Sequence, residues 1–230
     1  TAICNQIKNY LLNEDLENAV NFPLQDSSEL KGISSFLDLA DNLGIIHRNI
    51  SEGPIRSVEI NCFGTLDQIK PISLSFLRSL LQNRVPERVN FINAETIAKE
   101  LGIELSINYS TSNSNYSNLI SARVIAKNDI IFEGSVFNDD LPRLVNLMGY
   151  KMEVNLMGTL LFIQNDDVPG VVGKVGTILG KNKINIGAYL LSQHSREKLA
   201  FAVIRLDSPI DEKLISELAD LEELKFVNQI

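Results

Sequence analysis

The final third of the chain alternates between strand-like and helix-like segments, and this alternation restricts the fold more than any other feature. Four short segments beyond Gly158 predict strands: 159–165, 184–193, 199–207 and 224–230. Two longer segments between them, 168–181 and 211–221, carry apolar residues at helical spacing. The order βαββαβ predicts a ferredoxin-like unit, in which an antiparallel four-stranded sheet carries both helices on one face. Asp211 is the expected N-cap of the second helix.

The residues ahead of this unit predict a second, α+β domain. Helical spacing or capping residues mark helices over 36–43, 71–84 and 94–102, with Gly44 ending the first and Asn93 capping the third. Strands are expected at 57–64, 103–109, 118–127 and 130–137, and a short strand or turn at 89–93. The polar segment 110–118 predicts a hairpin loop between two of these strands.

Three parts therefore make up the predicted organisation, which is of the α+β class. Residues 1–25 hold a short amphipathic helix over 2–12 that needs a packing partner, and we expect them to be the tail of a longer protein's preceding domain. Residues 26–150 form the α+β domain, and residues 151–230 form the ferredoxin-like domain.

Composition excludes several classes of partner. The formal net charge is −8, whereas nucleic acids and anionic membranes require clustered basic residues. No apolar run approaches the roughly 20 residues that span a bilayer, and the first residues lack a secretory pattern. The two cysteines, Cys4 and Cys62, are too few for a disulfide framework or a cysteine metal site. We expect a cytoplasmic protein that contacts neither nucleic acid nor membrane.

The loop after the first strand of the last domain resembles a phosphate-binding turn only superficially. Its glycines, Gly170, Gly173 and Gly176, have the spacing G-x-x-G-x-x-G, whereas dinucleotide sites use G-x-G-x-x-G ahead of a parallel sheet. Asp166 and Asp167 would also repel a pyrophosphate. Gly173 and Gly176 lie one helical turn apart and suit close packing against a sheet or a partner helix.

The same loop supplies the polar groups of a zwitterion site. Asp167 offers a negative charge to an α-ammonium group, and Asn165 and Asn185 offer amide donors and acceptors. The first turn of the following helix offers free N–H groups to an α-carboxylate. We expect the end of the first strand, which carries Asn165 and Asp167, to lie near the start of the second strand, which carries Asn185. The simpler alternative is that Asp166 or Asp167 only caps the helix.

Other combinations of residues offer little chemistry. His47 and His194 are the only histidines and lie far apart in the sequence, so neither a catalytic nor a metal pair is expected. Arg143 and Lys151 could bind an anion near the junction of the last two domains, although solvated surface charges are the simpler interpretation. No nucleophile motif or acid–base pair occurs. The chain is therefore expected to contain no catalytic residues and no metal site.

Three consecutive segments resemble one known family, the long form of D-3-phosphoglycerate dehydrogenase. The sequence DDVPGVVGKVGTILGKNKINIGAYLLSQ resembles its amino-acid-binding ACT domain. The segments LDLADNLG, VEINCFGTL and VNFINAETIAKELGIEL resemble its intervening, allosteric substrate-binding domain. NYLLNEDLENAVNFP resembles the segment that leaves its catalytic core. The chain is thus similar to the regulatory portion of that enzyme.

The resemblance implies an NAD-dependent enzyme of serine biosynthesis that is inhibited by L-serine and forms an oligomer through paired ACT domains. It implies that serine contacts Asn165, Asp167 and Asn185, supported by the backbone of Val168 and Ile186. The family's NAD-binding domain and its catalytic Arg, Glu and His have no counterpart here, so NAD belongs to the missing catalytic domains. A second anion site between the regulatory domains is in doubt, because Asn155 stands where an arginine would match.

Two alternatives stay open at this point. The last domain could serve oligomerisation alone and bind no effector. The chain could also be a regulatory part of an L-serine deaminase, although the iron–sulfur cluster of such enzymes needs more cysteines than Cys4 and Cys62 supply.

Overall fold

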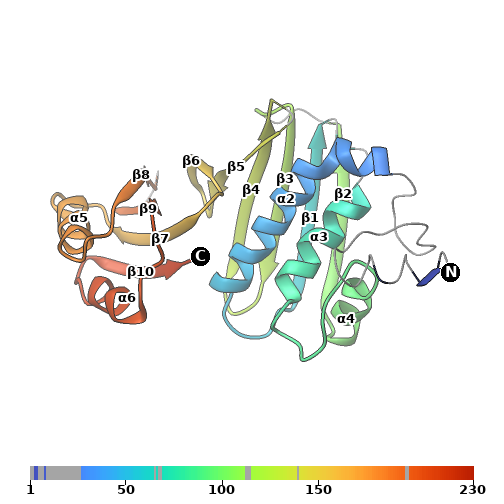
Figure 1. Ribbon diagram of the computed structural model, residues 1–230, viewed down its shortest axis with the longest axis horizontal. Helices are drawn as coiled ribbons and strands as arrows, with labels where there is room; N and C mark the ends of the chain where they lie inside the picture. The colour runs from blue at the N-terminus through green and yellow to red at the C-terminus, as the bar shows by residue number, and fades with distance from the viewer. Residues whose placement is uncertain are drawn as a thin grey trace.

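The computed structural model contains two β-sheets that lie side by side, each with its helices on one face (Figure 1). It describes residues 3, 4, 8 and 27–230, apart from 65, 67, 68, 112–114, 139, 195 and 196, and the side chains of 27–31 also lie outside the description. The helix predicted over 2–12 falls almost wholly outside the described residues. The α+β class and the ferredoxin-like unit are confirmed.

The first sheet has six strands in the order β2-β1-β3-β4-β5-β6. The strands are β1 (Ser57–Gly64), β2 (Glu104–Ser110), β3 (Asn118–Ile125), β4 (Asp129–Phe137), β5 (Leu141–Leu147) and β6 (Tyr150–Asn155). Two helices, α2 (Ser27–Ile50) and α3 (Ile69–Leu81), cover one face, and the short α4 (Ala94–Glu100) lies towards the β2 edge (Figure 1). Only the β1–β2 pair is parallel.

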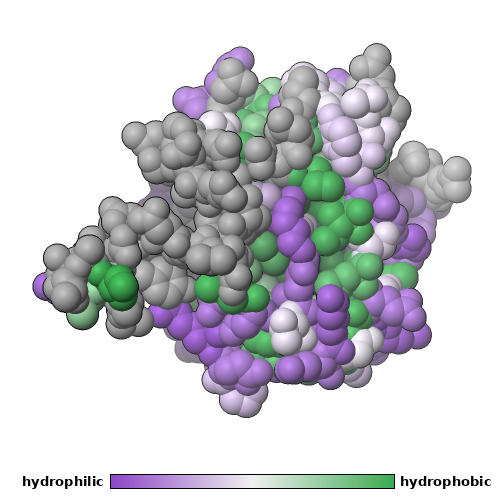
Figure 2. Space-filling model, turned by 90° about the vertical axis from the view of Figure 1, so that its right-hand side faces the viewer, coloured by the Kyte–Doolittle hydropathy of each residue, from purple (hydrophilic) through white to green (hydrophobic). Residues whose placement is uncertain are grey.

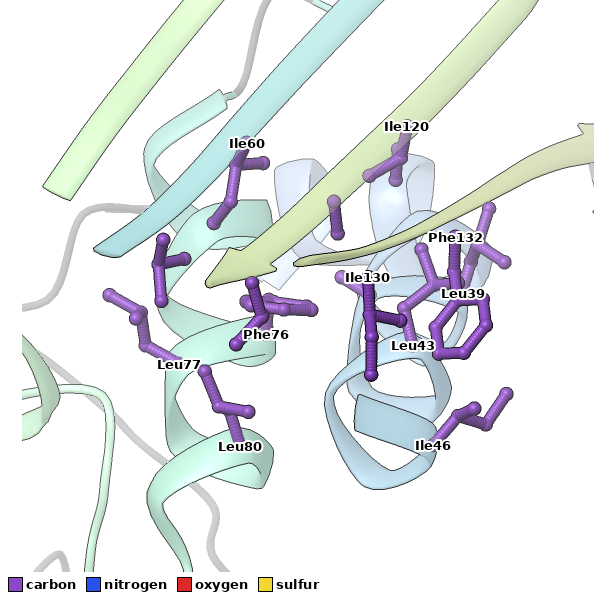
Figure 3. Packing of buried hydrophobic residues seen from close by; sticks show 14 of the residues in the cluster. Leu39, Leu43, Ile46, Ile60, Phe76, Leu77, Leu80, Ile120, Ile130 and Phe132 are labelled. Atoms are coloured by element: carbon purple, nitrogen blue, oxygen red, sulfur yellow. The ribbon is translucent and has the colours of Figure 1, made fainter. Parts of the chain in front are cut away.

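Apolar side chains from α2 and α3 interdigitate with those of the sheet to form the first core (Figure 3). Leu39 and Leu43 of α2, Phe76 of α3, and Ile60 and Phe132 of the sheet are all fully buried. At roughly 1.5–3 kcal/mol for each large apolar side chain that is removed from water, this layer supplies the main stabilisation of the domain.

The edge of this sheet at β2 is less completely covered. β2 pairs only with β1 within the described chain, so its other side is an open edge. Seen from this side, hydrophobic side chains interrupt the hydrophilic surface (Figure 2), and Ile92 and Leu101 are large apolar residues with about half of their surface exposed.

Gly44 does not end the first helix, contrary to the prediction. It lies in the interior of α2, where an added Cβ would come within 2.5 Å of the Phe76 carbonyl oxygen and 2.9 Å of the Ser79 Cβ. Glycine is therefore required by the close approach of α3 rather than by a helix end. The helix predicted over 71–84 is present as α3 and ends earlier, at Leu81.

Two further local predictions were wrong. The segment 110–118 is not a hairpin loop, because β1 lies between β2 and β3 in the sheet. Asn93 stands at the N-cap of α4 but its side chain makes no capping bond; its Oδ1 instead accepts from the backbone N–H of Asn90.

The segment 89–93, predicted as a short strand or a turn, forms a turn. Asn90 Oδ1 stabilises it by accepting from the N–H groups of Ile92 and Asn93.

Strands β5 and β6 had no counterpart in the prediction. They form a hairpin whose two-residue turn has positive φ at Met148 (50°) and Gly149 (94°), as a tight turn between twisted strands requires. The boundary predicted between residues 150 and 151 falls at the start of β6, so the first sheet runs past it to Asn155.

The second sheet has the order β10-β7-β9-β8. Its elements are β7 (Thr159–Asp166), α5 (Val171–Lys181), β8 (Ile186–Gln193), β9 (Leu199–Leu206), α6 (Glu212–Ala219) and β10 (Leu224–Gln229). The side chains of α5 and α6 form a second core with Leu161, Ile163 and Ile204 of the sheet. Asp211 caps α6 as predicted, its Oδ1 accepting from the Leu214 N–H at 2.8 Å.

The helix-free face of the second sheet contributes to the first core. Phe162, Phe201 and Val203 are buried in the same cluster as Tyr150 and Val154 of β6. The two sheets therefore share apolar contacts, because the first core extends from the first sheet onto this face of the second. Among the described residues, no helix is long and apolar enough to cross a membrane.

Candidate ligand-binding site

The end of β7 holds a buried amide with unused hydrogen-bonding capacity. Asn165 is only 3% exposed, and its Nδ2 donates to the Asp166 carbonyl oxygen at 2.7 Å. Its Oδ1 is buried and accepts no hydrogen bond from any residue that the structure describes. Leaving a buried acceptor unpaired costs about 1–3 kcal/mol, so a group that donates to it would remove this cost.

Asp167 lies beside the end of β8. Gln193 Nε2 donates to Asp167 Oδ2 at 2.8 Å, and the Asp167 backbone N–H donates to the Lys198 carbonyl oxygen at 3.0 Å. Asp166 instead forms an ion pair with Lys225 at 2.8 Å. Both acidic side chains are therefore held apart from the helix that follows them.

Neither aspartate caps α5, so the simpler alternative does not hold. The N-cap is Gly170, whose φ of 99° is accessible mainly to glycine, and no side chain caps the helix. The N–H groups of the first turn of α5 consequently lack the side-chain acceptor that most helices provide. Val168 lies in the turn with its side chain about half exposed and its N–H bonded to the Asp166 carbonyl oxygen.

Asn185 and Ile186 lie at the opposite end of the sheet, and this corrects the expectation that they meet the loop. Both β7 and β8 run antiparallel to β9, which separates them. Ile186 is in register with Leu206 of β9, whereas Asp166 is in register with Leu199. At about 3.3 Å per residue, these two ends of β9 are about 23 Å apart. One chain alone therefore does not bring Asn185 to Asp167.

The backbone of Asn185 is engaged locally. Its N–H donates to Asp207 Oδ1 at 3.2 Å, and its carbonyl oxygen accepts from the Asp207 N–H at 3.2 Å. These bonds involve only the backbone of Asn185. Its side-chain amide is exposed and lies just before the start of β8.

The outer face of α5 and the β8 edge both expose apolar side chains. A Cβ added at Gly173 or Gly176 would meet no atom within 4 Å, so these glycines do not pack against their own sheet. Val172 of α5 and Leu191 of β8 are both nearly half exposed, and among the described strands β8 pairs only with β9. The glycine spacing suggested close packing against a sheet or against a partner helix. Because Gly173 and Gly176 do not pack against the chain's own sheet, only the partner helix fits.

Sequence reasoning missed Gln193 as a member of this group. The residue is the last of the segment predicted as a strand, and the ferredoxin-like strand order places the end of that strand beside β9 and close to the loop after β7. Its position could have been found from the topology, but its bond to Asp167 depends on the side-chain conformation.

The two histidines lie in unrelated environments. His47 is fully buried between the rings of Phe76 (5.6 Å between centroids) and Phe132 (4.5 Å), with Nε2 3.1 Å from the Ala122 carbonyl oxygen. Burial lowers the pKa of His47 to about 3, so it is neutral. His194 follows β8 in the other sheet. No group of three metal-binding side chains occurs among the residues that the structure describes.

Arg143 and Lys151, for which solvated surface charges were the simpler interpretation, do not form a common cluster. Arg143 is opposite Asn155 in the β5–β6 register and Lys151 is opposite Asn146, so the two basic residues occupy different positions along the hairpin. Asn155 Oδ1 accepts from the Met157 N–H at 3.1 Å and shapes the connection to β7.

A dinucleotide does not fit the second sheet. All of its strand pairs are antiparallel, whereas dinucleotide sites form at the ends of parallel strands. The turn into α5 also carries two carboxylates, Asp166 and Asp167, which would repel a pyrophosphate. The second sheet therefore lacks the parallel strands that a dinucleotide site of this type requires.

Comparisons with known proteins agree with this architecture. Residues 32–148 match the model of the D-3-phosphoglycerate dehydrogenase intervening domain, and residues 159–223 match that of the ACT domain. The chain is 29% identical over 216 residues to D-3-phosphoglycerate dehydrogenase of Bacillus subtilis, covering 93% of this chain and 41% of that protein. It is 29% identical over 232 residues to D-3-phosphoglycerate dehydrogenase of Methanocaldococcus jannaschii, covering 99% of this chain and 44% of that protein.

The chain thus spans less than half the length of these curated relatives. The two family matches follow each other in the order of the two sheets, and the first covers half of the chain. The resemblance seen in the sequence is confirmed: the chain belongs to the D-3-phosphoglycerate dehydrogenase family and consists of that family's intervening domain followed by an ACT domain.

Proposed function

We propose that this chain senses L-serine, or a similarly small amino acid, as the regulatory region of an NAD-dependent D-3-phosphoglycerate dehydrogenase in the cytoplasm. Catalysis and NAD binding would belong to further domains of the parent enzyme, and effector binding would inhibit them. The observation that carries this proposal is the buried, unpartnered Oδ1 of Asn165 beside Asp167 and an uncapped helix N-terminus.

These groups match the charges of a free amino acid. The Asp167 carboxylate attracts an α-ammonium group, and the first-turn N–H groups of α5 attract an α-carboxylate. The Oδ1 of Asn165 accepts from the ammonium group or from a hydroxyl side chain. A ligand with three such polar groups in a small volume is favoured over a larger apolar amino acid.

The site is completed by a second copy of the chain. If two β8 edges pair antiparallel, Asn185 of one copy comes close to Gln193, and hence to Asp167, of the other. Three features support this arrangement: the open β8 edge, the exposed Val172 and Leu191, and the absence of neighbours around the α5 glycines. Val168 and Ile186 would frame the ligand from the two copies.

Isothermal titration with L-serine tests the proposal. The wild-type chain is expected to bind serine as a dimer, and Asp167→Asn is expected to weaken binding about ten- to hundredfold, because a hydrogen bond to a charged group contributes roughly 1.5–3 kcal/mol. Asp220→Asn, at the far end of α6, is a charge-matched control that should bind normally. Wild-type protein that gives neither heat nor a thermal shift with millimolar serine would contradict the serine assignment.

A mixed dimer tests whether two chains share each site. Asp167→Ala and Asn185→Ala should each abolish binding in homodimers. A dimer that combines one chain of each variant places both changes in one site and leaves the other site intact. Co-purified mixed dimers are therefore expected to bind one serine per dimer with wild-type affinity. Loss of all binding would place the site within one chain or elsewhere.

The alternative role in oligomerisation alone makes a different prediction. It requires no ligand, and under it the wild-type chain would dimerise but bind no amino acid. The buried acceptor of Asn165 favours an effector site instead. The serine deaminase alternative is set aside, because the chain belongs to the D-3-phosphoglycerate dehydrogenase family.

A further inference from the structure

Tyr150, the first residue of β6, packs against the helix-free face of the second sheet, where the β5–β6 hairpin lies between the two sheets (Figure 1). The residue is only 2% exposed. Its phenol oxygen accepts from Gln164 Nε2 of β7 at 3.2 Å. Its ring centroid lies 5.4 Å from that of Phe201 of β9 and 5.3 Å from that of His194, which follows β8. One side chain of the first sheet thus meets the ends of three strands of the second.

Two of these contacts involve the chain neighbours of residues in the candidate amino-acid site. Gln164 immediately precedes Asn165, whose buried Oδ1 has no partner among the described residues. His194 immediately follows Gln193, whose Nε2 donates to the Asp167 carboxylate at 2.8 Å. The contacts of the first sheet are therefore one residue away, along the chain, from the groups that form the site.

Strand pairing places the site and these contacts on opposite faces of the same strand ends. Asn165 and Gln193 are both in register with Ala200 of β9, whereas Gln164 is in register with Phe201. Successive side chains of a strand point to opposite faces of the sheet. Because Phe201 is buried in the first core, the row that holds Asn165 and Gln193 lies on the face that carries α5. The candidate site and the junction between the sheets hold the same strand ends from opposite faces.

His194 is fixed at this junction by several contacts. Its Nδ1 accepts from the Glu197 N–H at 3.1 Å. Its ring lies close to the β5–β6 turn, since a Cβ added at Gly149 would come within 3.5 Å of His194 Nε2. Further along the chain, the Lys198 carbonyl oxygen accepts from the Asp167 N–H at 3.0 Å. The residues that follow β8 thus contact both the hairpin of the first sheet and the loop of the site.

The amino-acid site needs its polar groups held together before a ligand binds. Asn165 projects from a buried strand end, whereas Asp167 is an exposed loop residue. A loop that becomes ordered only on binding loses conformational entropy, which weakens binding, and a loop that is already held does not. Gln193 and Lys198, which hold Asp167, lie on either side of His194 in the sequence. Loss of the junction is therefore expected to loosen Asp167.

We propose, on the basis of the function proposed above, that Tyr150 is a positioning residue of the amino-acid site. It does not touch the ligand, but it fixes the ends of β7, β8 and β9 from the opposite face, so the affinity for the amino acid depends on a side chain of the first sheet. Because coupling between two sites is reciprocal, a bound amino acid stabilises the contacts of Tyr150 to the same extent.

Isothermal titration of the whole chain with L-serine tests the proposal by comparing Tyr150→Leu with Phe132→Leu at a temperature at which both are folded. Both variants remove a buried ring from the first core, but Phe132 packs beside His47 of α2, at 4.5 Å between ring centroids. Tyr150→Leu is expected to weaken serine binding about tenfold and Phe132→Leu to change it less than about twofold. Tyr150→Phe keeps the ring and loses only the bond to Gln164, so it should retain most of the affinity.

Amide hydrogen exchange without ligand gives a second readout, which a general loss of stability would not produce. The Asp167 N–H, bonded to the Lys198 carbonyl oxygen, should exchange faster in Tyr150→Leu than in Phe132→Leu. The Leu214 N–H at the start of α6 is the control and should exchange equally in both variants.

His194→Ala replaces Tyr150→Leu in both measurements if the latter does not fold, because it removes a partly exposed ring from the same contact. It is expected to weaken serine binding about threefold. Equal serine affinities in the junction variant and Phe132→Leu, or equal exchange of the Asp167 N–H, would overturn the role of Tyr150 and leave the proposed function intact. Failure of the wild type to bind serine would instead contradict the proposed function itself.

Discussion

The side-chain amide of Gln164 donates a hydrogen bond to the phenol oxygen of Tyr150 at 3.2 Å, and this bond joins the two sheets. Tyr150 is only 2% exposed, and its ring lies 5.4 Å from that of Phe201. Gln164 immediately precedes Asn165 on β7. The bond therefore links β7, next to the candidate amino-acid site, to the strand that ends the first sheet.

Tyr150→Phe keeps the ring packing and removes this bond, so the free energy of unfolding should fall by about 1 kcal/mol. Urea denaturation monitored by circular dichroism measures the change. Tyr109→Phe is the control: it also removes one hydroxyl hydrogen bond, in which Tyr109 donates to the Gly64 carbonyl oxygen, but Tyr109 is 42% exposed and water can replace the bond. A larger loss for Tyr109→Phe than for Tyr150→Phe would contradict this account.

Gly44→Ala is expected to destabilise the protein by about 1–3 kcal/mol, because the new methyl group would overlap the Phe76 carbonyl oxygen and separate α2 from α3. Gly32→Ala in the same helix meets no atom within 4 Å and should instead stabilise it by up to about 1 kcal/mol through helix propensity. Thermal unfolding of both variants checks this opposite response. Equal shifts in Tm would show that propensity, rather than close packing, determines the role of Gly44.

Burial of neutral His47 makes stability depend on pH. Its pKa is lowered to about 3 from an ordinary value of 6.5, so below pH 6.5 the unfolded state takes up a proton that the folded state does not. The contribution of neutral His47 to the free energy of unfolding is therefore fully present well above pH 6.5, and it decreases as the pH falls towards 3. Between pH 7.5 and 5.5 the loss from this residue should be about 1.4 kcal/mol.

Urea denaturation at the two pH values, compared between wild type and His47→Leu, isolates this contribution. The variant loses the hydrogen bond to Ala122 but also the titrating group, so its stability should change less between pH 7.5 and 5.5. An identical pH dependence in both proteins would show that His47 is accessible to protons in the folded state.

The two cysteines should differ in reactivity. Cys62 is fully buried in β1 and burial raises its pKa to about 12, whereas Cys4 is exposed. Because the thiolate is the reactive form, a thiol reagent at pH 8 should modify one cysteine in the folded protein and two in denaturant. The variant Cys4→Ser should show no rapid reaction when folded. A rapid reaction of that variant would indicate that β1 opens readily.

The βαββαβ order of the second sheet followed from the sequence because each of its elements carries its own local signal. Alternating or continuous apolar runs of strand length predicted β7 to β10, and Asp211 marked the start of α6. Strand β5 lacks such a signal, because Pro142 and Arg143 interrupt its apolar positions. Strand β6 does alternate apolar and polar residues over YKMEVN, and the prediction missed this pattern because the segment is short. Their pairing arises from the hairpin turn at Met148 and from burial against the second sheet.

The candidate amino-acid site was also predictable only in part from the sequence. By itself, the sequence singled out the polar candidates Asn165, Asp167 and Asn185, because residue type and position next to a strand end are local properties. Only the tertiary structure decided that Asn185 lies at the far end of the sheet, since strand order results from pairing between distant segments. For the same reason, the role of Gly44 was visible only once α2 and α3 were packed together.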